Sequence, residues 1–160
     1  MADDPKIIRV TIDGHACEAR TGDRLVDVIL RAGISLPHVC YHPQLGPIQT
    51  CDTCMVEIDE KLTRACATAV SSDLRVATHS AAAYAAQREA FDRILANHLL
   101  YCTVCDKNNG NCTVHNTTKM LAVEHQAILF SPKPYEIDNS NPFYRYDPSQ
   151  CILCGRCVEA

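Results

Sequence analysis

Cysteine is the residue type that most constrains this chain, which has eleven cysteines among its 160 residues. An odd number of cysteines cannot close completely into disulfides. The first residues, Met-Ala-Asp-Asp-Pro-Lys, lack the charged-then-apolar pattern of a secretory signal, so we expect a cytoplasmic protein. In that compartment closely spaced cysteines more often bind metal than pair with each other. The sequence therefore predicts a metal-binding protein.

The first array of cysteines has the spacing C-x10-C-x2-C-x11-C and comprises Cys40, Cys51, Cys54 and Cys66. Thiolates are soft ligands, and four cysteines are the usual set for a two-iron cluster. The close pair in the middle can reach the metal from a single loop, whereas the outer two must come from flanking loops. Zinc could take the same four thiolates, so the spacing alone leaves iron and zinc open.

The second array has the spacing H-x3-C-x2-C-x6-C and comprises His98, Cys102, Cys105 and Cys112. The end of one helix could aim the histidine and the first cysteine at a single centre. The loop Asn108-Asn109-Gly110-Asn111 can return the chain to the last cysteine, and we expect a positive φ at its glycine. Three thiolates with one imidazole are also common at zinc, so the ligand types alone do not identify the metal.

The third array, C-x2-C-x2-C, comprises Cys151, Cys154 and Cys157. Bacterial ferredoxins continue this pattern as C-x2-C-x2-C-x3-C-P. The next cysteine would be residue 161, so we expect an incomplete four-iron ligand set and a chain that is part of a longer protein. A zinc-binding or unliganded tail is the alternative. Cys17 fits no array, and we expect it to be a buried, inert apolar residue.

Local patterns predict a small α+β sheet domain over residues 1–79. Asp13-Gly14 is a strong hairpin signal between two alternating apolar runs, and Asp23 can cap the helix that follows. The predicted elements are strands over 6–12, 15–20, 55–58 and 74–78, and a helix over 24–32.

The remaining residues divide into a helical segment, 80–129, and an irregular proline-rich segment, 130–160. The apolar periodicity predicts helices over 81–97 and 117–126. The formal net charge of −4 gives no sign of nucleic-acid binding, and no apolar run is long enough to span a membrane.

The residues around the first array resemble a known family. His38-Val-Cys40-Tyr-His42-Pro43 and Cys51-Asp-Thr-Cys54-Met-Val-Glu resemble the ferredoxin-like domain at the start of complex I large subunits, iron-only hydrogenases and some formate dehydrogenases. That resemblance implies a β-grasp domain that holds a [2Fe-2S] cluster through the first array.

The second and third arrays extend the resemblance. Asn97-His98-Leu-Leu-Tyr-Cys102-Thr-Val-Cys105 is similar to the one-histidine, three-cysteine motif that binds a [4Fe-4S] cluster in the same enzymes. The six-residue gap before Cys112 is similar to the formate dehydrogenase version, whereas the other two versions usually have five. Tyr146-Asp-Pro-Ser-Gln-Cys151 resembles the lead-in to a ferredoxin-type domain that is cut short here.

The resemblance implies the electron-transfer module of a formate dehydrogenase alpha subunit. Molybdenum or tungsten bound to a pterin would then carry the oxidation of formate elsewhere in the parent catalytic subunit, and a flavin/NAD(P)-binding, diaphorase-type subunit would be the partner. The module itself would have no catalytic residue and only transfer electrons. The alternatives are the same module of a complex I large subunit or an iron-only hydrogenase, and a zinc-stabilised interaction module without redox activity.

Overall fold

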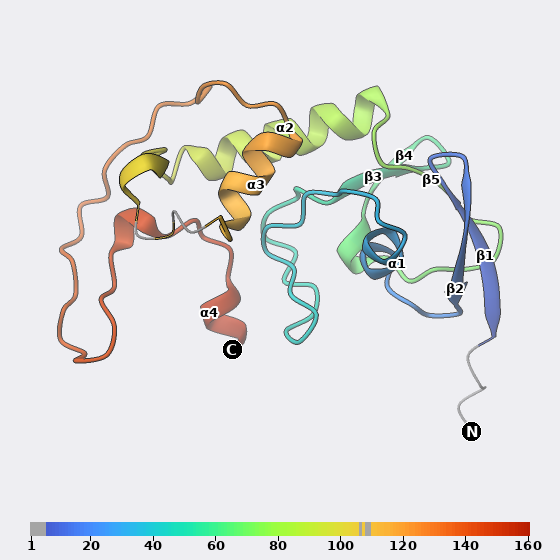
Figure 1. The fold of residues 1–160 in the computed structure, drawn as a ribbon, viewed down its shortest axis with the longest axis horizontal. Helices are drawn as coiled ribbons and strands as arrows, with labels where there is room; N and C mark the ends of the chain where they lie inside the picture. The colour runs from blue at the N-terminus through green and yellow to red at the C-terminus, as the bar shows by residue number, and fades with distance from the viewer. Residues whose placement is uncertain (1–5, 106, 108–109) are drawn as a thin grey trace.

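The computed structural model describes residues 6–105, 107 and 110–160 (Figure 1). It contains five strands, four α-helices and three single-turn 3₁₀ helices within those residues. In chain order they are β1 (Ile7–Ile12), β2 (His15–Arg20), α1 (Leu25–Arg31), β3 (Met55–Ile58), β4 (Lys61–Arg64), η1 (Ala65–Ala67), β5 (Arg75–Ala77), α2 (Ala81–Leu95), η2 (Cys102–Val104), α3 (Thr113–Met120), η3 (Pro148–Gln150) and α4 (Arg156–Glu159).

The N-terminal strands form one mixed sheet with the order β2-β1-β5-β3-β4. Strands β1 and β5 run parallel, and the other neighbours are antiparallel. Asp13 and Gly14 have φ values of 50° and 81°, the left-handed pair that a tight two-residue hairpin needs. The sheet and the helix α1 confirm the mixed α+β expectation.

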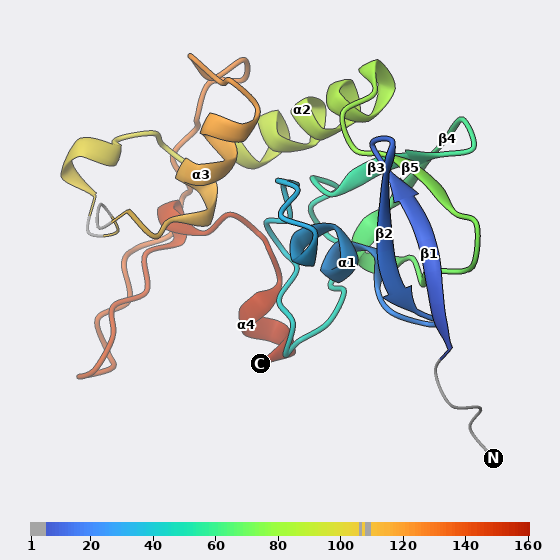
Figure 2. The ribbon, with the colours of Figure 1, turned by 45° about the vertical axis from the view of Figure 1, so that its right-hand side comes forward.

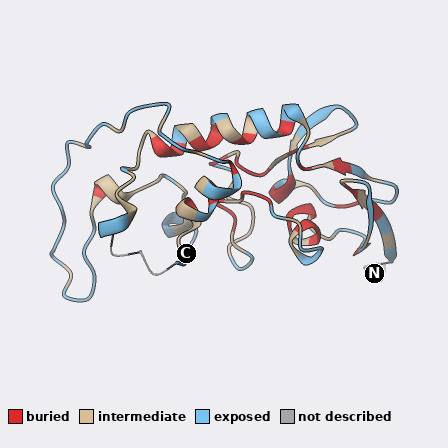
Figure 3. Ribbon diagram, turned by 45° about the horizontal axis from the view of Figure 1, so that its top comes forward, coloured by how far each residue is buried: buried red, intermediate tan, exposed pale blue. Residues whose placement is uncertain are grey.

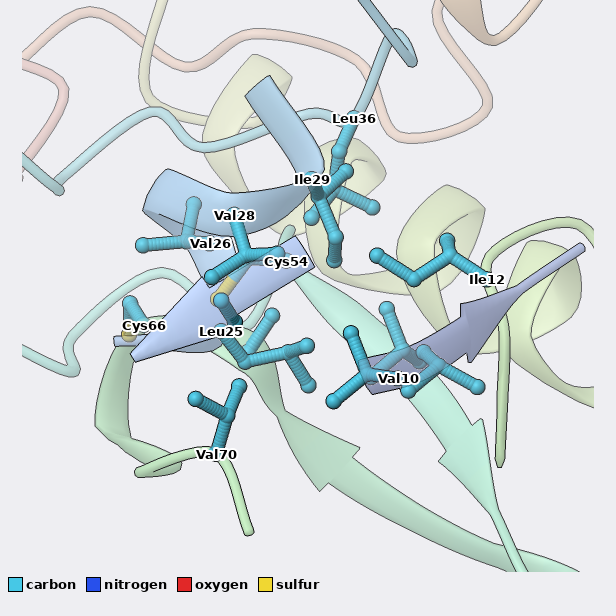
Figure 4. Close-up of a cluster of buried hydrophobic side chains, with 14 of the residues drawn as sticks. Val10, Ile12, Leu25, Val26, Val28, Ile29, Leu36, Cys54, Cys66 and Val70 are labelled. Carbon is cyan, nitrogen blue, oxygen red and sulfur yellow. The ribbon is translucent and has the colours of Figure 1, made fainter. Parts of the chain in front are cut away.

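The first core lies between this sheet and α1 (Figure 4). Strand β1 turns Val10 and Ile12 inward, where they meet the buried face of α1. That face repeats at helical spacing because α1 is amphipathic, with Asp27 and Arg31 outside the cluster. The other buried members of the first core are Ala19, Leu25, Val26, Val28, Ile29, Leu36, Tyr41, Cys54, Val56, Ala65, Cys66, Val70 and Val76.

Helix α2 leads from the sheet to the second half of the chain (Figure 1). Ser80 caps its first turn by accepting a hydrogen bond from the amide of Ala83. Gln87 is fully buried, and its side-chain amide donates to the carbonyls of Met55 (2.7 Å) and Thr78 (2.9 Å). These bonds hold the middle of the helix on strand β3 and on the end of β5.

The second core lies beyond those bonds, around the C-terminal half of α2. The buried residues of α2 lie along one side of the helix, while the opposite side is exposed (Figure 3). Helix α3 contributes Val114 to this core, and Leu121, the first residue after α3, also belongs to it. The buried members of the second core are Val39, Cys40, Cys51, Phe91, Ile94, Leu95, Val114 and Leu121.

Residues 124–147 form a long arm without helix or strand, part of which loops away from both cores (Figure 2). Asp138 and Tyr146 pair in an antiparallel bridge within the arm, with two backbone hydrogen bonds of 2.9 Å. The chain then returns toward the centre, where α4 lies near the loop that follows α1 (Figures 1 and 2). No helix in the described ranges has both the length and the hydropathy of a membrane-crossing segment.

Three local expectations were wrong. The helix predicted over 117–126 lies instead over Thr113–Met120, because Ala122 takes a left-handed φ of 47° that stops it. Asp23 does not cap α1; its carboxylate binds the guanidinium of Arg31 at 2.5 Å and accepts from the amide of Arg20. Strand β4 was missed because its turn, Asp59-Glu60, adopts positive φ without a glycine.

Core packing generates a stability prediction. Ile29 is fully buried in the first core, whereas Ile7 is 75% exposed on β1. Ile29→Ala removes buried methyl groups and leaves a cavity, so we expect it to lower the free energy of unfolding by about 2–5 kcal/mol. Ile7→Ala is the matched control and should change it by less than about 0.5 kcal/mol. Urea unfolding of the metal-free chain measures both, and equal effects would contradict the assigned core.

Candidate metal centres

The first array comes together where the two cores meet. Cys54 and Cys66 belong to the first core, and both are labelled in it in Figure 4. Cys40 and Cys51 belong to the second core. Cys40, Cys54 and Cys66 are each 1% exposed and Cys51 is 7% exposed, so water has almost no access to the four sulfur atoms.

The four thiols interact as two hydrogen-bonded pairs. The hydrogen bond from Cys51 lowers the pKa of Cys40 to about 5, and the reciprocal interaction raises the pKa of Cys51. In the other pair the hydrogen bond from Cys54 lowers the pKa of Cys66, while the same contact raises the pKa of Cys54. Each pair therefore favours one thiolate, the form of cysteine that binds metal.

The two pairs also lie close to each other, since Cys66 interacts electrostatically with Cys40 and Cys51. In a two-iron cluster held by four cysteines, each iron takes two thiolates. Two adjacent pairs of buried thiols fit that requirement. Among the described residues, no three histidine, cysteine or acidic side chains are grouped as a site for a single metal ion.

The loop that carries Cys51 and Cys54 is held by side chains on both sides. The hydroxyl of Thr53 is fully buried, accepts from the amide of Val39 (3.0 Å) and contacts the Cys51 sulfur at 3.1 Å. Asp52 has a φ of 56° and binds Arg64 at 2.5 Å and Arg93 at 3.5 Å. Buried polar contacts and the ion pairs keep the loop in this strained turn.

The second array surrounds a cavity of about 50 Å³ beyond the end of α2. His98, Cys102, Cys105 and Cys112 all line it, together with Gly110, whose φ of 83° agrees with the expected turn. Part of the predicted Asn108–Asn111 loop lies outside the described residues. The structure thus brings the four predicted ligands to one place.

His98 has an atom free to serve as a ligand. Its Nδ1 is buried without a hydrogen-bond partner. Burial lowers the pKa of the imidazole, and the nearby Lys133 adds to the effect, so the neutral form that binds metal is favoured. The backbone carbonyl of His98 accepts from the Gln126 side chain at 2.9 Å, which holds this turn in place.

The predicted placement of His98 and Cys102 at the end of one helix was wrong. Helix α2 ends at Leu95, so His98 and Cys102 do not project from one helix end as predicted. His98 lies in the turn after α2, and Cys102 begins the 3₁₀ helix η2. Cys112 precedes α3 as its N-cap residue.

The third array lies beside the other two. The ammonium group of Lys133 donates to the carbonyls of Cys151 (2.5 Å) and Pro148 (2.9 Å) and approaches that of Asn97 (3.5 Å), next to His98. The hydroxyl of Thr50, next to Cys51, donates to the carbonyl of Cys154 at 3.0 Å. A hydrogen bond thereby joins the third array to the loop that carries Cys51.

The second core connects all three arrays. Cys40 and Cys51 of the first array are buried in it, and Cys112 of the second and Cys154 of the third pack against it. Phe91, Ile94 and Leu95 of α2 form its centre. Cysteines of all three arrays therefore lie in or against one apolar cluster.

Sequence reasoning missed the residues that hold the arrays in place. Thr53, Gln126 and Lys133 bind backbone or sulfur atoms of site segments, and no motif marked them. A hydroxyl inside the Cys51–Cys54 pair was the one available signal. Cys17 lies outside the arrays as expected, but it is half-buried at the edge of the first core, where we expected it buried.

Two family models match most of the chain between them. Residues 6–81 match a 2Fe-2S iron-sulfur cluster binding domain. Residues 87–127 match the iron-sulfur binding region of NADH-ubiquinone oxidoreductase-G. The two matched regions contain the first and second arrays, respectively.

Individual relatives point to the same enzymes. The chain is 50% identical to a Bacillus subtilis protein named "Putative formate dehydrogenase YrhE", over 98% of this chain and 16% of that one. It is 52% identical to "Putative formate dehydrogenase SH0748" of Staphylococcus haemolyticus, over 94% of this chain and 15% of the relative. The chain thus spans about one sixth of the length of the curated relatives it matches.

A solved structure has the same fold. An NAD+-reducing [NiFe]-hydrogenase in the H2-reduced state superposes with a TM-score of 0.86 at 27% identity, over 96% of this chain and 65% of the hydrogenase chain. The fold, the buried thiol pairs and the two family matches define the chain as an iron–sulfur electron-transfer module. More particularly, it is related to formate dehydrogenase, complex I and hydrogenase, and the expected resemblance is confirmed.

The second array generates a test of its histidine ligand. Because imidazole is neutral and thiolate is anionic, His98→Cys should keep a four-iron cluster and lower its reduction potential. His125→Cys, at an exposed position, is the control and should leave that potential unchanged. Redox titration followed by electron paramagnetic resonance measures the shift. An unchanged spectrum and potential in His98→Cys would show that the imidazole is not a ligand.

Proposed function

We propose that the chain is the electron-relay module of a formate dehydrogenase alpha subunit. In this proposal it carries electrons between a molybdenum or tungsten pterin site elsewhere in the parent subunit and a flavin/NAD(P)-binding partner subunit. The observation that carries the relay is the second core, because cysteines of all three arrays pack in or against this one apolar cluster. Sites in series around one dry cluster are suited to electron transfer.

The proposed ligands divide into three sets. Cys40, Cys51, Cys54 and Cys66 would hold a [2Fe-2S] cluster in a β-grasp domain over 1–79. His98, Cys102, Cys105 and Cys112 would hold a [4Fe-4S] cluster in a domain over 80–129. Cys151, Cys154 and Cys157, in the segment 130–160, would supply three ligands of a further [4Fe-4S] site in the parent protein.

Bound clusters of these types supply one-electron transfer, and the residues of the chain determine where and at what potential. The buried thiol pairs would hold the two-iron cluster at the junction of the cores, and Thr53 would keep its loop in position. Phe91, Ile94 and Leu95 are buried in the cluster against which cysteines of all three arrays pack. Burial and hydrogen bonds around the sulfur atoms are the means by which proteins set cluster potentials.

Formate is the favoured substrate of the parent because of the similarity to the relatives named as formate dehydrogenases. The six-residue gap before Cys112 supports the same choice. NAD(P) as the final acceptor draws on the NAD+-reducing enzyme with the same fold. The same module in a complex I large subunit or an iron-only hydrogenase is the second candidate, and the match of residues 87–127 to the NADH-ubiquinone oxidoreductase-G region supports it. A cytoplasmic location stays a prediction.

Metal analysis separates the redox proposal from a zinc-stabilised module. An anaerobic preparation should be brown and contain about six irons per chain from the first two arrays, with acid-labile sulfide. Cys54→Ser should abolish or strongly alter the two-iron signal and leave the four-iron signal. Cys17→Ser, outside the arrays, is the matched control and should keep both. A colourless, zinc-containing protein without sulfide would refute the relay.

The parent activity needs the full-length protein with its partner. We expect the purified enzyme to reduce the module's clusters with formate and not with hydrogen, as followed by bleaching of their visible absorption. Reduction by hydrogen alone would favour the hydrogenase alternative. Reduction by NADH, with no response to formate, would favour the complex I alternative.

A further inference from the structure

Arg156, in the segment of the third array, binds backbone carbonyls in the first array's loop. Its Nη2 donates to the carbonyl of Tyr41 at 2.8 Å, and its Nε approaches the carbonyl of Cys40 at 3.4 Å. Arginine keeps its charge at any working pH and makes directed, charge-assisted hydrogen bonds. A fixed positive charge therefore sits against the peptide group that follows the first predicted two-iron ligand.

Two neighbouring residues of the same segment lie against the same loop. A Cβ atom on Gly155 would lie 2.8 Å from Cγ2 of Ile48, and its φ of 75° also favours glycine. The carbonyl of Cys154 accepts from the Thr50 hydroxyl. Residues 154–156 thus contact the loop between Cys40 and Cys51 at three successive positions.

The other end of the Arg156 contact is held as well. The hydroxyl of Tyr41 donates to the carboxylate of Asp27 on α1 at 2.5 Å, and the Arg24 guanidinium lies 5.7 Å from the Tyr41 ring centre. Tyr41 is 2% exposed and belongs to the first core. The carbonyl that Arg156 binds is therefore part of a backbone segment that α1 already holds rigidly.

We propose that Arg156 is a positioning residue that clamps the third array onto the first array's loop and raises the reduction potential of the two-iron cluster. Reduction adds one negative charge to that cluster, and the half-buried cation of Arg156, next to buried Cys40, stabilises the added charge. The same residue lies between two predicted ligands of the third array, Cys154 and Cys157. One side chain would then link the geometry of one centre to the potential of another.

This inference rests on the proposed function, and potentials test it in the anaerobically reconstituted chain. Arg156→Gln should make the two-iron cluster about tenfold harder to reduce, which is about 59 mV lower for one electron. Arg156→Lys keeps the positive charge but loses the two guanidinium contacts to adjacent carbonyls, so we expect a smaller decrease of the potential. Arg145→Gln removes the same charge from the exposed arm and is the matched control, with no expected change.

The clamp itself is measured by hydrogen exchange in the same iron-loaded chain. Arg156→Gln should speed exchange of the amides in residues 39–46 about tenfold, and Arg145→Gln should not. A wild-type chain without iron would overturn the proposed function itself. If Arg156→Gln binds the normal amount of iron and its two-iron cluster keeps the wild-type potential, the role of Arg156 is wrong. An equal shift of potential in Arg145→Gln would have the same consequence. Neither result would contradict the proposed function. Unchanged exchange in residues 39–46 would overturn the clamp.

Discussion

The burial of four thiols at the junction of two cores is the constraint on which the rest of the structure depends. Cys54 and Cys66 lie in the first core, and Cys40 and Cys51 lie in the second. Thiolates without partners are costly in such a place, because an apolar environment disfavours unpaired charge. The hydrogen-bonded pairs reduce that cost, and coordination to metal would remove it. Each core therefore contributes two of the four thiols, and the four together form the boundary between the cores.

The chain reaches this boundary from one side through α1 and from the other through α2. Gln87 holds α2 on the sheet, and the next turns of the same helix provide Phe91, Ile94 and Leu95 for the second core. The second array then assembles beyond the end of α2, and the third array lies between it and the loop of the first array. Their positions follow from one helix and a small number of buried hydrogen bonds, including those of Gln126 and Lys133.

Local signals were sufficient where a residue's neighbours in the chain determine its conformation. Asp13-Gly14 placed the first hairpin, and the long periodic helix α2 was recognised to within two residues of its end. The turn of β4 escaped because Asp59 and Glu60, both exposed, take positive φ in a two-residue hairpin turn that contains no glycine. The end of α3 escaped because exposed Ala122 also takes a positive φ that its residue type does not signal.

The candidate ligands themselves could be read from spacing, since close cysteine pairs must lie together whatever the fold. The arrangement of the arrays could not. Arg156 meets the carbonyl of Cys40 across 116 positions of sequence, and no local pattern encodes such a contact. The supporting residues Thr53 and Lys133 also act through the folded backbone. Ligand identity is thus a property of short motifs, whereas the coupling between sites is a property of the tertiary structure.

The continuous helix α2 has a consequence for how this module can diverge. Each residue of an α-helix advances the chain by about 1.5 Å and rotates it by about 100°. One inserted residue between Gln87 and Phe91 would turn everything after it through more than a quarter circle and move Phe91 off the second core. A chain that uses both anchors must therefore keep the length and phase of the segment from Gln87 to Leu95.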